Sequence, residues 1–235
     1  MQESTGKTEE LDKNINLQEI YKDIILKFRS KDISNIISGK TIIHNQCLDN
    51  LSLFEPYLLQ IMEVICSEDG FISNKNRDIR ENFFNVMITI LEEININAIT
   101  ILLQHIYKVL NHHRWEPQLY GLKCILHLIE IKVDAVRRNL QEIIPNVSDL
   151  MISSKKEIAE YSKETMLAIC KTSGNKDIEP FIEQIIKSVL YPTEVSNCVH
   201  ALASTVFVQK VESPALAIVE PLLIRGIKEN KIAMK

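Results

Sequence analysis

Residues 55–61 read Glu55-Pro56-Tyr57-Leu58-Leu59-Gln60-Ile61, and variants of this apolar segment return four times further along the chain. The variants are Thr100-Ile101-Leu102-Leu103-Gln104, Ile144-Pro145-Asn146-Val147, Glu179-Pro180-Phe181-Ile182 and Glu220-Pro221-Leu222-Leu223. Aligning Pro56 with Thr100, Pro145, Pro180 and Pro221 gives steps of 44, 45, 35 and 41 residues. Each step has room for one helix, a partner helix and two turns. The pattern therefore predicts a stack of helix pairs.

An independent set of positions repeats with the same period. Ile79, Leu119, Ile158 and Val195 are 40, 39 and 37 residues apart and hold one register of the partner helices. The first helices of the pairs are expected at about 54–67, 97–111, 136–152, 177–190 and 214–228, and the second helices at about 77–94, 116–132, 155–172 and 194–208. We therefore predict an all-α HEAT-repeat α-solenoid, a right-handed superhelix of antiparallel helix pairs.

The chain divides into three parts on this interpretation. Residues 1–15 are polar and are expected to form a disordered tail. Residues 16–52 should form N-terminal capping helices, with the apolar segment after Ile33 broken at Gly39 and Asn45. Residues 53–235 should form the HEAT repeats. The last repeat lacks a partner helix, which suggests a fragment of a longer protein.

Composition narrows the class of protein. Hydrophobic residues make up 46% of the 235, which is ample for a continuous core. No apolar run reaches the roughly 18 residues of a membrane span, so we expect no membrane partner and a cytoplasmic location. A net charge of −4 argues against a general nucleic-acid binder, DNA included. Five widely spaced cysteines are expected to be reduced core residues, namely Cys47, Cys66, Cys124, Cys170 and Cys198.

No constellation of residues predicts catalysis. The tripeptides Gly6-Lys7-Thr8 and Gly39-Lys40-Thr41 lack the first glycine and the preceding strand of a phosphate-binding loop. The pair His112-His113 lacks a third ligand nearby and is expected to be a solvated turn rather than a metal site. We predict that this chain is not an enzyme and has no catalytic, cofactor-binding or metal-binding residues.

Basic residues gather near the expected turns and suggest a binding surface. Equivalent turns of a helical stack share one edge, so their charges can form a ridge that faces phosphates or an acidic protein. The alternative is that these residues are ordinary solvated helix ends and that Trp115 packs between repeats. The candidate contact residues are Arg114, Trp115, Arg137, Arg138, Lys155, Lys156, Arg225 and Lys228.

Several segments resemble the N-terminal HEAT region of translation elongation factor three, a ribosomal ATPase with tandem ATP-binding cassettes. The resemblance rests on residues 54–66, Arg114-Trp115, residues 154–158, and most specifically on residues 175–226. It implies a domain that binds ribosomal RNA and ribosomal proteins. In that family, ATP hydrolysis by the cassettes, with Mg, promotes tRNA release from the exit site. This chain has no Walker motif, so ATP, Mg and the cassettes would belong to the rest of the parent polypeptide.

Two other functions stay open. A similar segment occurs in the HEAT-repeat translational activator of general amino acid control, which would make the chain a protein-interaction scaffold in amino acid starvation signalling. Helical solenoids also serve as adaptors unrelated to translation.

Overall fold

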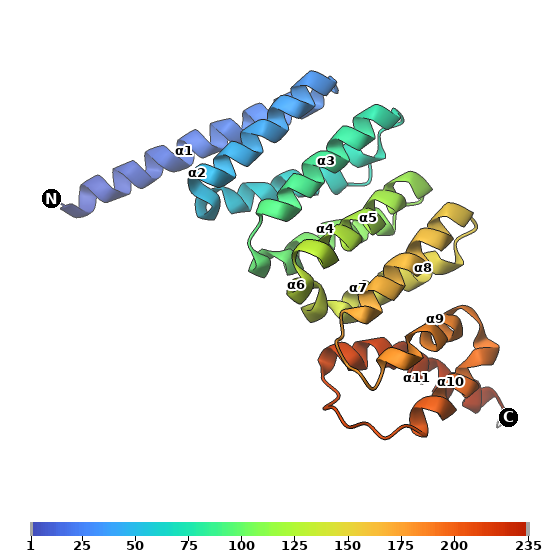
Figure 1. Cartoon of the computed structure of the whole chain (residues 1–235). Helices are drawn as coiled ribbons and strands as arrows, with labels where there is room; N and C mark the ends of the chain where they lie inside the picture. The colour runs from blue at the N-terminus through green and yellow to red at the C-terminus, as the bar shows by residue number, and fades with distance from the viewer. Residues whose placement is uncertain (1, 234–235) are drawn as a thin grey trace. The chain divides into compact units, whose positions relative to one another are not determined.

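The computed structural model of the chain describes the backbone of residues 2–233 and the side chains of residues 15–228. All regular elements in this described part are helices, as expected for an all-α HEAT-repeat fold (Figure 1). The chain forms two compact units, residues 1–109 and residues 110–235. The right-handed sense of the superhelix stays a prediction.

The first unit is built around a long, bent helix. Helix α2 (Ile33–Cys66) packs against both α1 (Gln2–Arg29) and α3 (Arg77–Glu93). After α3, the 3-10 turn η2 (Ile96–Ala98) leads into α4 (Ile99–Leu110). The backbone of helix α1 runs from Gln2, and the side chains of residues 1–14 lie outside the described part, so the disordered tail expected at residues 1–15 stays a prediction.

The break in the apolar segment after Ile33 does not lie where the sequence predicts it. Asn50 leaves the helical region, with φ −160° and ψ 60°, whereas α2 continues through Gly39 and Asn45. Gly39 instead makes room for the buried ring of Phe28, since a Cβ there would lie 2.5 Å from its Cε1. The glycine is therefore a close-packing position and not a helix end.

The second unit consists of helices of 6 to 21 residues that pack against one another. Helix α8 contacts α5, α7 and α9, and α11 contacts α7, α9 and α10 (Figure 1). The bounds are α5 (Trp115–Ile131), α6 (Val133–Arg138), α7 (Leu140–Ser148), α8 (Lys156–Lys171), α9 (Ile182–Leu190), α10 (Val195–Ala203) and α11 (Ser213–Ala233).

Two expected helices of the second unit end or divide differently. The helix expected over 136–152 is split at Asn139, a buried residue whose side-chain amide donates to the carbonyl of Ala135. The helix expected over 194–208 ends at Ala203, where the hydroxyls of Ser204 and Thr205 donate to the carbonyls of His200 and Ala201, and further on the Asp177 carboxylate binds the amide of Val208. In both places a polar side chain replaces the helical hydrogen-bond pattern.

The cysteines lie in the buried core. All five cysteines are free and buried, as predicted. Burial raises the pKa of the Cys170 thiol to about 12, so this thiol stays protonated.

Among the described residues no single helix is long and apolar enough to cross a membrane. In the part of the chain that the structure describes, one bent pair, Arg77–Glu93 with Ile96–Leu110, meets the length and composition together, across a bend of 119°.

Candidate interaction surface

The candidate surface lies where α5 and α8 begin. These two helices pack against each other, and their N-cap residues are Arg114 and Lys155. Neither side chain caps its helix, since guanidinium and ammonium groups have no acceptor for an amide. A cation at the positive end of a helix dipole is unfavourable for stability and favourable for binding an anion.

Trp115 joins the two helix starts. The ammonium Nζ of Lys155 lies 4.3 Å from the centre of the Trp115 ring, within the range of a cation–π interaction. The ring is 36% exposed, so it both packs across repeats and keeps a free edge toward solvent. The structure thus brings Arg114, Trp115 and Lys155 together, and we call these three the α5–α8 edge.

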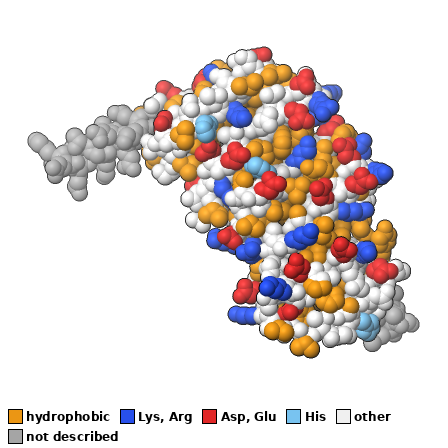
Figure 2. All heavy atoms as spheres, viewed as in Figure 1, with side chains coloured by type: hydrophobic (Ala, Val, Ile, Leu, Met, Phe, Trp, Pro, Cys, Tyr) orange, Lys and Arg blue, Asp and Glu red, His pale blue; other side chains and the backbone are white. Residues whose placement is uncertain are grey.

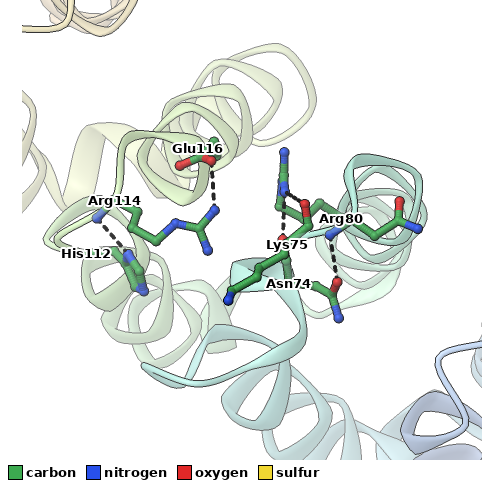
Figure 3. A network of polar contacts seen from close by, with 7 residues as sticks. Asn74, Lys75, Arg80, His112, Arg114 and Glu116 are labelled. Carbon is green, nitrogen blue, oxygen red and sulfur yellow. Dashed lines mark hydrogen bonds and ion pairs between the residues drawn. The ribbon is translucent and has the colours of Figure 1, made fainter.

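The turn before α5 is held in place by its histidine. The Nδ1 atom of His112 accepts a hydrogen bond from the amide of Arg114 at 3.0 Å, and the guanidinium of Arg114 donates to Glu116 at 2.7 Å (Figure 3). The carbonyl of His112 accepts a further bond from Gln118 at 2.7 Å. His112 is buried, whereas His113 is exposed, so the solvated turn that the sequence predicts is wrong for His112 and confirmed for His113. The contacts of His112 position the backbone of Arg114.

Two other candidate arginines bind backbone carbonyls at helix ends. Arg137 donates from Nε to the carbonyl of Thr172, 2.8 Å away, and from Nη1 to Asp134, 2.9 Å away. Arg225 donates from Nη1 to the carbonyl of Val189 at 2.6 Å. In the first unit Arg80 does the same with the carbonyls of Asn74 and Lys75 (Figure 3). These contacts satisfy carbonyls that a helix end or turn leaves without a partner.

Replacing Arg137 by methionine should lower the free energy of unfolding by about 1 kcal/mol, because the carbonyl of Thr172 loses a charged donor while the apolar stem is kept. Urea denaturation followed by the fluorescence of the single tryptophan, Trp115, measures this change. Arg138 is exposed, and Arg138→Met should change stability by less than about 0.5 kcal/mol. Equal losses for the two variants would contradict a clamping role for Arg137.

The candidate residues do not all share one edge. Arg137 contacts the last turn of α8, whereas Lys155 precedes its first turn, and a 16-residue helix is about 24 Å long. Arg138 and Lys228 are exposed on other parts of the second unit. Lys156 is exposed beside Lys155 and lies 3.5 Å from the carboxylate of Glu160. The predicted continuous ridge is therefore divided, and the α5–α8 edge is its most compact part.

Carboxylates border the α5–α8 edge. A shallow hollow on α8 is lined by Lys155, Lys156, Glu157, Glu160, Tyr161 and Glu164. Burial raises the pKa of the Tyr161 hydroxyl, and Glu164 and Glu130 raise it further. Basic and acidic side chains are likewise interspersed on the face in Figure 2. A binding partner thus meets local positive charge and not an extended basic field.

Sequence reasoning missed the structural neighbours of the candidate residues. The cation–π contact joins Trp115 to Lys155, 40 positions away and in the next repeat, and only the repeat register could have suggested it. The sequence places His112 in solvent, although a histidine two residues before an N-cap can accept a hydrogen bond from the amide of that N-cap. The roles of all eight candidates in binding stay predictions.

Comparison with known proteins places the chain in a family. Residues 7–166 match the family described as EF3 N-terminal HEAT repeat, and residues 194–235 match the one described as Elongation factor 3/GNC1 HEAT repeat.

Similar proteins include Elongation factor 3 of Phytophthora infestans, 32% identical over 95% of this chain and 21% of that protein. Elongation factor 3A of Saccharomyces cerevisiae is 33% identical over 87% of this chain and 19% of that protein. Elongation factor 3 of Candida albicans is 30% identical over 92% of this chain and 21% of that protein. The chain therefore spans about a fifth of the length of these relatives, within the region of HEAT repeats. From the match over residues 7–166 and the all-α fold of paired helices, the chain belongs to the elongation factor 3 family, as its N-terminal HEAT-repeat region.

Proposed function

We propose that this chain is the ribosome-binding HEAT domain of an elongation-factor-three-like ATPase that acts in translation elongation in the cytoplasm. ATP hydrolysis, Mg binding and exit-site tRNA release would be activities of the whole protein through cassettes that follow this domain. The domain itself would bind ribosomal RNA and ribosomal proteins, and would also support the cassettes. The names of the relatives and the match to the family support this assignment.

The observation that carries the proposal is the pair of helix starts with cationic N-caps. Helix N-termini usually carry Ser, Thr, Asp or Asn, whose oxygens accept the first amides. Here Arg114 and Lys155 stand in that place on two adjoining helices, and Trp115 adds an exposed aromatic edge. Asp32 and Asn76 cap α2 and α3 in the ordinary way, whereas α6, α7, α9 and α10 also lack a side-chain cap, so the feature particular to α5 and α8 is that two cationic N-caps adjoin each other. Two cations and a partly exposed aromatic ring suit a phosphate backbone with an unstacked base, and the guanidinium of Arg114 would exchange Glu116 for a phosphate.

Co-sedimentation with purified Saccharomyces cerevisiae ribosomes across a salt series tests the proposal. Binding through phosphates releases counterions, so affinity should fall steeply as salt rises, with a slope of roughly 0.7–0.9 per phosphate contact on logarithmic axes. With four contacts the affinity would fall about 50–150-fold between about 50 mM and 200 mM salt. No binding at the lowest salt would contradict a ribosome-binding role for the isolated domain.

A scaffold role in a translational activator is the second candidate. The match of residues 194–235 is to a family that Elongation factor 3 and GNC1 share, so this segment fits either protein. Such a domain would bind another protein in place of ribosomal RNA, and its binding should change little with salt. The same salt series therefore distinguishes the two candidates.

A further inference from the structure

The loop between α10 and α11 exposes apolar side chains in a row. The sequence predicts helix up to residue 208, but residues 204–212 form the non-helical trace that links α10 to α11 in Figure 1. Val206 is 83% exposed and Val208 is 85% exposed, while Phe207 between them is 38% exposed. Adjacent apolar residues with this exposure are unfavourable in water and often mark a contact site.

Hydrogen bonds fix this loop to the turn after α8. The carboxylate oxygen Oδ2 of Asp177 accepts the amides of Val208 at 2.8 Å and of Gln209 at 2.7 Å. The side-chain carbonyl of Gln209 accepts the amide of Lys176 at 2.7 Å. Three bonds between segments about 30 residues apart hold the loop in one conformation.

The turn that carries Asp177 is itself well defined. Gly174 has φ +64°, a left-handed conformation that glycine adopts without strain. The buried side chain of Asn175 accepts the amides of Asp177 at 3.0 Å and of Ile178 at 3.2 Å. The chain therefore uses a special turn and three polar side chains to hold two valines in solvent.

Such an arrangement suits binding better than stability. If residues 204–208 continued α10, their amides would be bonded within the helix and no tether would be needed. A loop that is already ordered loses little conformational entropy when a partner binds, so its affinity is higher than that of a flexible segment. Failure of the local helix pattern at a position with dedicated polar support is typical of a functional site.

We propose that the 204–212 loop docks onto a protein, with Val206 and Val208 entering an apolar pocket and the exposed Lys176 and Lys210 facing carboxylates at its rim. Valine side chains cannot hydrogen-bond or stack on bases, so an RNA partner fits this loop poorly. The proposal rests on the proposed function, because the apolar pocket would belong to a ribosomal protein. It assigns to the loop a contact separate from the phosphate contact at the α5–α8 edge.

The double variant Val206→Ser with Val208→Ser should bind Saccharomyces cerevisiae ribosomes about tenfold more weakly at every salt concentration, because apolar contact is not screened. The slope against salt should stay that of the unchanged protein. Leu48→Ser, at a 69% exposed leucine of the first unit, is the matched control and should bind as the unchanged protein does. Unchanged binding of the double variant would overturn the proposal.

Cross-linking and hydrogen exchange separate the possible failures. A photo-reactive phenylalanine analogue in place of Val206 should cross-link to a ribosomal protein, and cross-links to RNA alone would overturn the docking proposal. Asp177→Ala should speed exchange at the amides of Val208 and Gln209 and weaken binding in the same direction as the valine changes. If the unchanged protein does not co-sediment at any salt, the proposed function fails first. If it co-sediments without a Val206 cross-link, only the loop proposal fails.

Discussion

We expect reversal of charge at both lysines of the α8 start, Lys155→Glu with Lys156→Glu, to weaken ribosome binding about 100-fold at about 50 mM salt. Each lysine that neutralises a phosphate contributes about one decade of affinity at that salt, from a slope of about 0.8 per contact. At about 200 mM salt the same variant should lose only about tenfold, and its slope against salt should be lower by about 1.6. Lys155 also loses its contact with the ring of Trp115, so the anchor of the edge becomes looser.

A variant with the same change in net charge is the control for this result. Lys171→Glu with Lys187→Glu also reverses two exposed cations, neither of them a candidate contact residue, and Lys171 ends α8 whereas Lys155 precedes it. This pair should keep its affinity within about threefold, as expected for charges outside the contact. If the control pair loses more than the lysine pair, the ribosome faces the opposite end of the helices, and the α5–α8 edge is not the contact.

The fold could be predicted from the sequence because its main signal is periodic. Apolar positions recur with the helical period inside each element and with the repeat period between elements. Near the starts of the second helices, Ile79, Ile158 and Val195 are therefore buried, and Leu119 is half-buried. A helix is stabilised mainly by burial of such a stripe. Element type therefore follows from local sequence alone.

Helix breaks could not be predicted in this way, because distant residues decide them. Helix α10 ends at Ala203, and the amides of Val208 and Gln209 beyond it bond to Asp177, about 30 positions upstream. Gly39 predicts a helix break, but the helix continues through it and the glycine leaves room for the ring of Phe28. Ser154 and Glu157 have the spacing of a capping box, yet the N-cap of α8 is Lys155, which makes no side-chain cap. Each of these predictions fails because a residue distant in sequence, or a charged residue at the N-cap, decides the local structure.

The sequence predicts which residues are candidates for the surface, but not which of them lie together. The sequence marks Arg114, Trp115 and Lys155 as residues near turns, and the structure places them together. It marks Arg137 and Arg225 in the same way, although their guanidinium groups bind the carbonyls of Thr172 and Val189. An arginine near a turn can bind a partner or a helix end, and only the position of the nearest carbonyl distinguishes the two.

The substitution expected to cost most stability is Phe83→Ala in the first unit. The ring of Phe83 is fully buried, stacks on Phe71 at 4.5 Å and meets Phe28 edge-on at 5.2 Å. Removing it leaves a cavity whose walls belong to three different elements: α1, the 3-10 turn η1 (Phe71–Ser73) and α3. Large-to-small changes of this kind cost about 3–5 kcal/mol. We expect a loss of about 4 kcal/mol in the free energy of unfolding of this unit.

Hydrogen exchange of peptides from α1, α2 and α3 measures this loss directly, since exchange from the globally open state follows the free energy of unfolding. Phe83→Leu keeps most of the volume and should cost less than about 2 kcal/mol. Phe207→Ala, at a 38% exposed ring of the second unit, should cost less than about 1 kcal/mol. If Phe83→Ala changed exchange no more than Phe207→Ala does, the three rings would not form the core of this unit. In that case the glycine at position 39 would not be needed for packing, because it leaves room for the Phe28 ring that contacts Phe83.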